Sequence, residues 1–339
     1  MTPAQNAAEP LRVGILGAAR IADLAIVKPA RLTGVRLVAV AARNRSLARA
    51  FADKHGVERV VDSYQEVIEH PEVEAVYNPL ANSLHPVWNV AALRAGRHVL
   101  TEKPSASNAE QARSVRDVVE ETGLTFMEGF HYYYHPLIGR LKEILAAGEI
   151  GELRRVESSL AMPAPADDDL RWQFDLAGGA LMDLGCYALH SQRMLAEFGG
   201  GEPTAVRAKA SERAGHPGVD EWLTAELEYP SGLTGTASCD MTADSVDMHL
   251  RVVGTQGEVL IPEFVNVHVD DRILVTTEDG TRTERPGSQS SYTYQLEAFI
   301  DAVRTGQPPV TDAADSVRTM DLIDTCYRAA GLPLRPTHH

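Results

Sequence analysis

Apolar residues follow two different patterns along this chain. Up to about residue 128, short and almost continuously apolar runs alternate with segments that carry helix-starting and helix-ending residues. Strands buried on both faces of a parallel sheet have this apolar character, and helices connect one strand to the next. The first part of the chain is therefore predicted to be a doubly wound parallel sheet with strands at 11–16, 35–41, 73–77, 97–101 and 124–127.

The helices between these strands are predicted from their capping residues. A serine accepts a hydrogen bond from the first turn of a helix, and a glutamate three residues later completes a capping box. Gly17 is expected to start a turn that leads into another helix. Serine caps are predicted at Ser46, at Ser63 with Glu66, and at Ser107 with Glu110.

After residue 129 the pattern changes to neighbouring strands joined by short turns. Such strands favour a largely antiparallel sheet that buries one face on helices and leaves the other open. Helices are predicted at 136–147, 292–305 and 312–330, and strands at 153–161, 204–211, 223–229, 233–240 and 249–253. The expected fold class is α/β, with a tail at 1–10, a Rossmann domain at 11–128 and an α+β domain at 129–339. The closing helices are free to pack back on the first domain.

Composition narrows the classes of function. The 339 residues suit two domains, and the net charge of −15 opposes binding to nucleic acid. No apolar run reaches the length of a membrane span, and the first ten residues lack the features of a secretory signal. The three cysteines show neither a metal-binding spacing nor a disulfide framework. A cytoplasmic enzyme without a metal site is expected.

A glycine turn follows the first predicted strand. A strand–turn–helix of this kind can hold a dinucleotide pyrophosphate on its backbone N–H groups. Ala19 departs from the usual second glycine, and its methyl group limits how closely a phosphate can approach. The alternative is an ordinary turn between a strand and a helix. The predicted cofactor-binding residues are Gly17, Ala18, Ala19, Arg20 and Ile21.

The end of the second predicted strand indicates which dinucleotide binds. Ala42, Arg43, Asn44 and Arg45 include no acidic residue that would bind the ribose 2′-hydroxyl of NAD. A guanidinium at Arg43 can instead pair with the 2′-phosphate of NADP and stack on adenine. The alternative is a pair of solvated arginines near the start of a helix. NADP(H) is therefore the predicted cofactor.

A charged pair ends the strand predicted at 97–101. Strand interiors hide charge, so Glu102 and Lys103 before Pro104 indicate a site at the sheet edge where open α/β sheets bind ligands. A polar loop follows the third strand and reaches the same edge. Further cofactor contacts are therefore predicted for Pro79, Leu80, Asn82, His85, Glu102 and Lys103.

Asp183, Tyr187 and His190 are spaced i, i+4 and i+7, so they are expected to share one face of a helix. Tyr187 can exchange a proton with a substrate, and a nearby Lys103 ammonium would lower its pKa. Lys103, Tyr187 and Asp183 are the predicted catalytic residues. Packing of the tyrosine in the core and a buried hydrogen bond for His190 are the alternatives.

Substrate contacts are predicted for Asp183, Tyr187 and His190, and from two further places. Arg171 and Trp172 could bind and stack on a sugar, and His131 lies in an aromatic segment after the last strand of the first sheet. His131 and His135 do not form a helical metal pair, because Pro136 follows at once.

These motifs resemble the glucose–fructose oxidoreductase, inositol dehydrogenase and rhizopine catabolism (Gfo/Idh/MocA) family over nearly the whole chain. The matching features are the glycine turn, the segment 82–85, Glu102-Lys103-Pro104 and the segment 178–187. Asp183 and Tyr187, four apart, are similar to the branch with NADP-dependent xylose and dihydrodiol dehydrogenases and sugar 3-ketoreductases. The resemblance implies catalytic roles for Lys103 and Tyr187, and a homodimer or homotetramer formed through the open sheet.

The expected function is NADP(H)-dependent hydride transfer to or from a carbinol or keto carbon of a sugar or nucleotide sugar. Tyr187 is expected to transfer the proton, Lys103 to orient the substrate oxygen, and Asp183 to hold the substrate or the lysine. A nucleotide-linked ketosugar reductase and an aldose 1-dehydrogenase both fit. A regulator that binds a dinucleotide without chemistry is the alternative from another class, and a purely structural dimerisation protein is a third.

Overall fold

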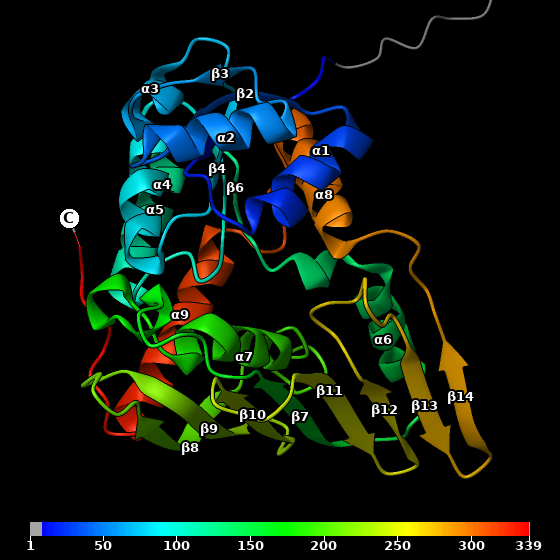
Figure 1. Ribbon diagram of the computed structural model, residues 1–339. Coiled ribbons are helices and arrows are strands. Elements are labelled where there is room, and N and C mark those ends of the chain that lie inside the picture. Colours follow the sequence, from blue (N-terminus) through cyan, green and yellow to red (C-terminus); the bar gives the residue numbers. More distant parts are fainter. Residues whose placement is uncertain (1–8, 339) are drawn as a thin grey trace, which may run out of the picture.

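The computed structural model describes residues 9–338, so residues 1–8 of the expected tail lie outside the described part. Within it, six strands form a parallel sheet in the order β3-β2-β1-β4-β5-β6 (Figure 1). The chain reverses its direction of winding between β1 and β4, and ligands bind at such a point beside the carboxyl ends of the strands. The strands are β1 (Arg12–Leu16), β2 (Arg36–Ala41), β3 (Arg59–Val60), β4 (Ala75–Asn78), β5 (His98–Thr101) and β6 (Phe126–Glu128).

Helices cover both faces of this parallel sheet, as predicted. Neighbouring strands are in register with Ile15 of β1 beside Val40 of β2 and Tyr77 of β4. One face packs on a cluster that includes Phe51 of α2, and the other on a cluster that includes Val67 of α3. The helices are α1 (Lys28–Thr33), α2 (Arg45–His55), α3 (Tyr64–Glu69), α4 (His85–Arg94) and α5 (Ala109–Thr122).

The helix starts differ from the prediction in two places. Asn44, not Ser46, caps α2, because its side chain accepts hydrogen bonds from the amides of Ser46 and Leu47. Asn108 caps α5 in place of Ser107. The turn that begins at Gly17 leads into a helix as predicted, and the first turn of that helix, Asp23–Val27, is π-helical. Ser63 caps α3 as predicted.

The second sheet has eight strands within the described residues, in the order β14-β13-β12-β11-β7-β10-β9-β8. All its pairings are antiparallel except that of β7 with β10. This confirms the predicted α/β class with a largely antiparallel second sheet. The strands are β7 (Leu153–Ala161), β8 (Thr204–Glu212), β9 (Asp220–Glu228), β10 (Thr234–Asp240), β11 (Asp247–Gly254), β12 (Gly257–Ile261), β13 (Ile273–Thr277) and β14 (Gly280–Glu284).

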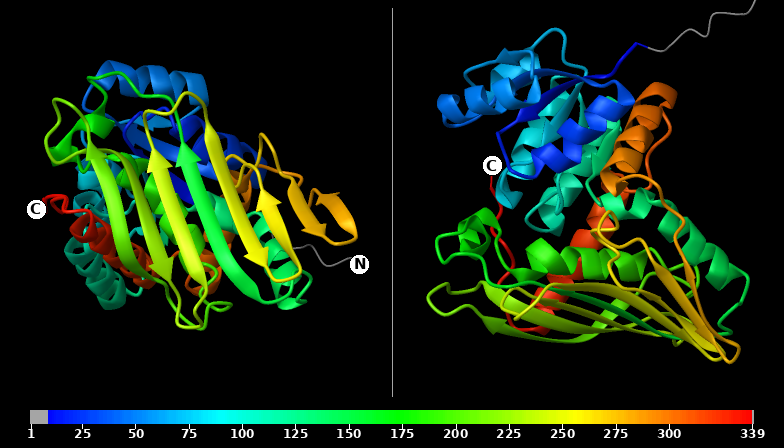
Figure 2. Two further views of the ribbon diagram at one scale, coloured as in Figure 1. Left: turned by 90° about the horizontal axis from the view of Figure 1, so that it is seen from below. Right: turned by 45° about the vertical axis from the view of Figure 1, so that its right-hand side comes forward.

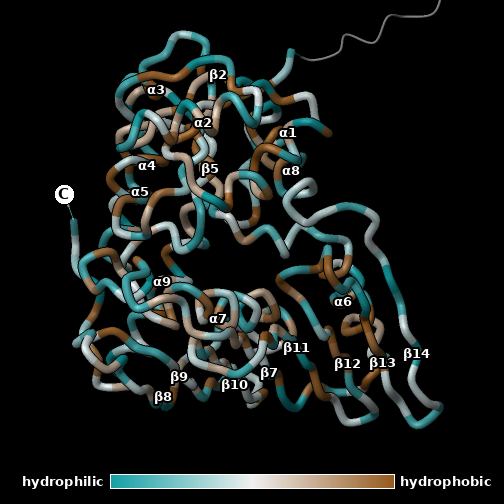
Figure 3. Tube along the Cα trace, viewed as in Figure 1, coloured by the Kyte–Doolittle hydropathy of each residue, from teal (hydrophilic) through white to brown (hydrophobic). Residues whose placement is uncertain are grey.

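One face of the second sheet packs on helices and the other is open (Figure 2, left). The inward residues of β9 and β10, such as Leu223 and Ala237, join one large buried cluster. That cluster also contains residues of α6 (Pro136–Ala146), α7 (Cys186–Arg193) and α9 (Ala313–Ala329). Figure 3 shows hydrophobic stretches of the chain along these helices and strands.

The closing helices connect the two sheets. Phe299 of α8 (Ser291–Thr305) packs in the same cluster as Ile15 of β1, and Ala313 of α9 packs on the opposite face of the first sheet. Thr311, between the two helices, donates a hydrogen bond to the carbonyl of Glu128. Within residues 9–338, no helix is both long and apolar enough to cross a membrane.

Candidate active site

A cavity of about 330 Å³ lies at the carboxyl edge of the parallel sheet, facing α7 and the second sheet. Its lining combines the turn after β1, the loops after β4 and β5, and the segment 169–187. The predicted residues that line it are Ala19, Arg20, Ile21, Pro79, Leu80, Asn82, His85, Glu102, Lys103, Arg171, Asp183 and Tyr187. The structure thus brings the three expected catalytic residues together with part of the expected cofactor-binding set, while Gly17, Ala18 and residues 42–45 are not in the lining.

The turn after β1 has the shape that a dinucleotide requires. Gly17 has a φ of 96°, a conformation that glycine adopts without strain. A Cβ atom at this position would also lie 3.0 Å from a side-chain carbon of Leu80. Because Ala19, Arg20 and Ile21 follow directly and line the cavity, this turn can accommodate a pyrophosphate.

The segment after β2 lies outside the cavity lining. Asn44 caps α2, and Arg45 forms an ion pair with Asp62, so both side chains have structural partners. Arg43 is exposed, and Tyr64 of α3 lies beside it. Contact of Ala42, Arg43, Asn44 and Arg45 with a 2′-phosphate remains a prediction, for which Arg43 is the accessible cation.

His85 and Asn82 hold the lining loops together. One ring nitrogen of His85 lies 2.7 Å from the carbonyl oxygen of Pro104, and the other lies 2.9 Å from that of Leu80. Burial lowers the pKa of His85 to about 4, and because a neutral imidazole carries one N–H, it donates to only one of these two carbonyls at a time. Asn82 donates to the carbonyl of Ala177, on the opposite side of the cavity. Both residues therefore fix the walls, whatever contact they make with a cofactor.

Lys103 and Asp183 meet in the cavity. The Lys103 ammonium donates to the backbone carbonyl of Asp183 at 2.6 Å, and lies 3.6 Å from the Asp183 carboxylate. Burial opposes the charge of Lys103, but Asp183, Cys186 and Glu102 together outweigh it, and the pKa of the lysine is raised. Arg171 lies 3.0 Å from the other carboxylate oxygen. Asp183 therefore holds two cations in place.

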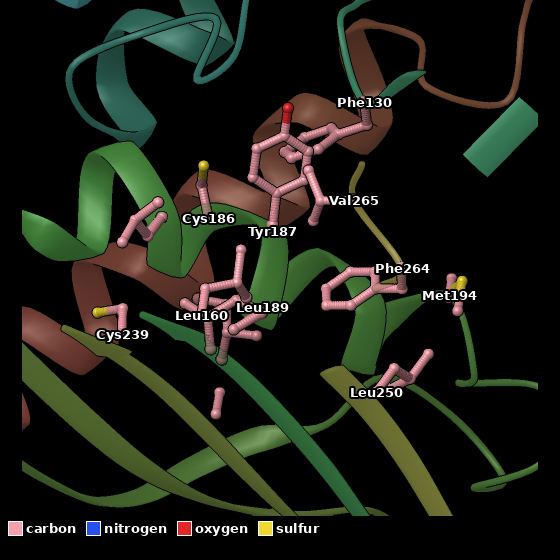
Figure 4. Close-up of a cluster of buried hydrophobic side chains, with 14 of the residues drawn as sticks. Phe130, Leu160, Cys186, Tyr187, Leu189, Met194, Cys239, Leu250, Phe264 and Val265 are labelled. Carbon is pink, nitrogen blue, oxygen red and sulfur yellow. The ribbon is translucent and has the colours of Figure 1, made fainter. Parts of the chain in front are cut away.

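Tyr187 points its hydroxyl away from the apolar cluster that surrounds its ring (Figure 4). The Lys103 ammonium lies over the ring, 4.8 Å from its centre, rather than at the oxygen. Burial, together with nearby Tyr292 and Glu102, raises the pKa of Tyr187 well above its ordinary value. The expectation that Lys103 lowers this pKa is therefore wrong for the protein without ligands, and Tyr187 is a protonated group.

His190 does not share the cavity face of Asp183 and Tyr187. A π-helical turn at Leu181–Gly185 precedes α7, and its wider hydrogen-bonding repeat breaks the expected 3.6-residue spacing. His190 is buried, with Tyr132 on one ring nitrogen and Asp315 on the other. The structure thus supports the alternative of a buried hydrogen bond, and not substrate contact.

Trp172 and His131 also lie outside the lining. Trp172 is buried, its indole N–H is directed at the carbonyl of Pro165, and Arg213 stacks on its ring. Its indole ring is therefore not accessible for stacking on a sugar. His131 is fully buried behind Tyr187.

The lining also contains residues that the sequence patterns did not indicate. Asn266 comes from the loop after β12, and Tyr292 from the first turn of α8, about a hundred residues after Tyr187 in the chain. No local motif marks either of them. The other unpredicted members are Leu160, Asp169, Leu170, Leu176, Gly178, Leu184, Met248 and Val265.

Two glycines allow close packing beneath the cavity. A Cβ atom on Gly178 would lie 2.3 Å from the carbonyl oxygen of Arg171, and one on Gly179 would meet Asp220 and Arg335. Arg335 is fully buried, donates to the Gly178 carbonyl at 2.6 Å and pairs with Asp220. A late part of the chain therefore supports the segment that carries Asp183.

Comparison with known proteins identifies the family. Residues 11–130 match an oxidoreductase family with an NAD-binding Rossmann fold, and residues 138–260 match the GFO/IDH/MocA C-terminal domain. The chain is 35% identical over 321 residues to D-xylose 1-dehydrogenase (NADP(+)) 2 of Haloferax volcanii, covering 94% of this chain and 96% of that protein. The chain belongs to the Gfo/Idh/MocA oxidoreductase family.

Other members of the Gfo/Idh/MocA family act on nucleotide sugars. A dTDP-3,4-didehydro-2,6-dideoxy-α-D-glucose 3-reductase of Streptomyces antibioticus is 38% identical, over 94% of this chain and 97% of that protein. The 3-ketoreductase KijD10 of Actinomadura kijaniata, solved with NADP and TDP-benzene, superposes with a TM-score of 0.87 at 28% identity. That match covers 94% of this chain and 98% of KijD10. The predicted family, its NADP-dependent branch and the oxidoreductase class are confirmed.

Proposed function

We propose that this protein is an NADPH-dependent reductase of a ketosugar, either free or linked to a nucleotide. The observation that carries the proposal is the convergence of Lys103, Asp183 and Tyr187 in a cavity that continues to the glycine turn. A bound nicotinamide would supply the hydride. Arg20 and Ile21 lie where they can hold the cofactor, and Arg43 is the cation available to its 2′-phosphate.

The charges in the cavity suit transfer of a proton to a substrate oxygen. Tyr187 is protonated at neutral pH, and its raised pKa keeps it so, which leaves the hydroxyl able to donate to an oxygen that is becoming an alkoxide. Lys103 stays charged beside it and stabilises negative charge on the same oxygen. Asp183 keeps the ammonium in place through its carbonyl and its carboxylate.

The relatives support the sugar as a substrate class. Two of them, from Streptomyces antibioticus and Actinomadura kijaniata, are named as 3-reductases of a dTDP-linked ketosugar. KijD10 has also been solved with a single lysine or a single tyrosine replaced, the two residue types that meet in this cavity. An aldose 1-dehydrogenase is the second candidate, favoured by the relative from Haloferax volcanii.

A substrate panel tests the proposal. Free ketosugars, dTDP-linked ketosugars and aldoses are incubated with NADPH or NADP, and the absorbance of NADPH is followed. Oxidation of NADPH by a ketosugar supports the reductase, whereas reduction of NADP by an aldose alone supports the dehydrogenase. NADPH binding without turnover on any sugar would instead indicate a regulator.

We also propose that the open face of the second sheet binds a second copy of this chain. The outward residues of its central strands include the short polar Thr236 and Ser238, the half-buried Trp222, and the ion pair of Arg251 with Glu157. A sheet face of this kind suits sheet-on-sheet packing. Light scattering after size exclusion should give a dimer or tetramer, and Thr236→Arg should shift it towards the monomer.

A further inference from the structure

The hydroxyl of Tyr187 has a partner on the side away from Lys103. Its oxygen lies 3.1 Å from Nε2 of His131, a residue of the short 3₁₀ turn His131–Tyr134 that follows β6. His131 is fully buried and does not line the cavity. A substrate therefore reaches Tyr187 but not His131, so His131 can act only through the tyrosine.

Ser291 holds the other side of the His131 ring. Its Oγ lies 2.8 Å from Nδ1 of His131, and it is fully buried at the start of α8. The ring also stacks on Tyr292, with centres 3.8 Å apart and planes 26° apart. Contacts from α7 and α8, both far from His131 in the sequence, thus fix the position and plane of its imidazole.

The imidazole is neutral. Burial, together with the Lys103 charge, lowers the pKa of His131 to about 3. A neutral imidazole donates a hydrogen bond from one nitrogen and accepts one at the other. The hydrogen bonds through Ser291, His131 and Tyr187 must therefore all run in the same direction.

Only one of the two directions presents a proton to the cavity. If His131 accepts from Tyr187, the phenolic proton points away from the substrate. If Ser291 donates to Nδ1, then Nε2 carries the proton and donates to Tyr187, whose own O–H is free to point into the cavity. The serine hydroxyl permits this second arrangement because it can be a donor.

We propose that His131, held by Ser291, is a positioning residue that donates its Nε2–H to the Tyr187 oxygen and so directs the phenolic proton at the substrate. This inference rests on the proposed reductase function. In the step, the Tyr187 O–H bond breaks and an O–H bond forms on the substrate oxygen as its carbon receives the hydride. The phenolate left behind accepts the His131 N–H, and water entering the cavity returns the proton after the product leaves.

The test separates hydrogen bonding from packing. His131→Phe preserves a flat ring against Tyr292 but removes the donor, whereas His131→Gln retains an N–H. Ser291→Ala removes the group that fixes the tautomer. Tyr132→Phe is the matched control, because Tyr132 lies in the same turn and its hydroxyl contacts His190 rather than Tyr187. Circular dichroism and thermal melting check that each variant is folded.

The readouts are kcat, KM and the solvent deuterium isotope effect on kcat, measured with NADPH and the ketosugar that the panel identifies. A hydrogen bond to a developing charge corresponds to about a 10- to 100-fold effect on rate. His131→Phe should therefore lower kcat about 10- to 100-fold with little change in KM, and it should raise the isotope effect. Ser291→Ala should also lower kcat, but by a smaller factor than His131→Phe. His131→Gln should retain most of the wild-type kcat.

The inference is overturned if His131→Phe retains the kcat and isotope effect of Tyr132→Phe, or if only KM changes. If His131→Phe does not fold, Ser291→Ala decides by the same criteria. Wild-type protein that oxidises no NADPH with any ketosugar would overturn the proposed function itself. An active wild type with an unaffected His131→Phe would overturn only the role of His131.

Discussion

Two tyrosine–histidine pairs lie side by side in this molecule, and only one of them faces the cavity. The turn after β6 supplies His131 and Tyr132, and α7 supplies Tyr187 and His190. Tyr187 lies 3.1 Å from His131, and Tyr132 lies 2.6 Å from His190. Phe130 contacts both pairs, stacked on His190 and edge-on to Tyr187, and the Tyr132 and Tyr187 rings also meet, with centres 5.9 Å apart.

The surroundings of the two pairs differ. Nε2 of His190 lies 3.1 Å from the Asp315 carboxylate, and Arg193 lies 3.0 Å from the same carboxylate. The Tyr132–His190 pair therefore ends at a buried ion pair, and we call it the sealed pair. Tyr187 opens to the cavity beside the Lys103 ammonium. A tyrosine–histidine pair is therefore structural where it ends at a buried ion pair. It is suited to proton transfer where a ligand can reach the tyrosine.

The largest expected effect comes from removing the hydroxyl at the cavity. Tyr187→Phe should lower kcat for ketosugar reduction by about 100- to 10,000-fold, because the proton donor is lost. Tyr132→Phe removes the equivalent hydroxyl from the sealed pair and should leave kcat within about twofold of wild type, on the reasoning that no ligand reaches it. Steady-state kinetics on both variants compare the pairs directly. Equal losses would show that access to the cavity does not distinguish them.

Asp315→Asn should disturb the sealed pair through stability rather than rate. It leaves the buried Arg193 with Glu202 as its only carboxylate partner among the described residues, which should lower the free energy of unfolding by up to about 3 kcal/mol. Urea unfolding measures the loss, and kcat of the folded protein should remain near that of wild type. Asp321→Asn is the control, because its ion pair with Arg113 is exposed. A large fall in kcat for Asp315→Asn would mean that the sealed pair also serves the reaction.

Glu128, close to Asp315, makes stability depend on pH. Burial, with the Asp315 charge, raises the pKa of Glu128 to about 7 from 4.5. Between these values the folded protein retains a proton that the unfolded chain has released, so stability falls as pH rises through this window and is level above it. The shift corresponds to about 3 kcal/mol.

Glu128→Gln should remove most of this pH dependence. Urea unfolding of wild type and variant at pH 5 and pH 8 gives the difference, and an exposed glutamate changed in the same way, Glu120→Gln, is the control. If the wild type and Glu128→Gln lose the same stability between the two pH values, Glu128 does not hold a proton in the folded state.

Two lysines that lie over tyrosine rings allow a second comparison, for which a smaller effect on kcat is expected. Lys103 lies over the Tyr187 ring at 4.8 Å, and Lys142 lies over the Tyr133 ring at 5.3 Å, away from the cavity. Lys103→Met should lower kcat about 10- to 100-fold, because a charged donor to the substrate oxygen is lost. Lys142→Met should leave kcat unchanged. A similar kcat for both variants would remove Lys103 from the reaction.

The sequence predicted those parts of the site that depend on strand ends. Lys103, Asn82 and Ala19 follow strands of one parallel sheet, and the carboxyl ends of parallel strands meet at one edge. Their meeting in the cavity therefore follows from the apolar pattern alone. Asp183 and Tyr187 were recognised because a polar stripe on an apolar helix indicates a site.

The rest depended on contacts that no local pattern encodes. The π-helical turn that moves His190 off the cavity face inserts a wider repeat into an otherwise regular helical pattern. Tyr292 and Asn266 reach the cavity only because α8 and the loop after β12 fold back on it. Asn44 and Asn108 cap helices one or two residues from serines of similar capping strength, so sequence alone could not choose between them.

The position of Arg335 near the end of the chain bears on the order in which parts of the active site can form during synthesis. The carbonyl of Gly178 that it binds lies 157 residues earlier in the chain. During synthesis the dinucleotide turn and Lys103 therefore emerge and can fold long before the support beneath Asp183 is available. The contacts of Arg335 with Gly178 and Asp220 can therefore form only after the chain has been made up to residue 335.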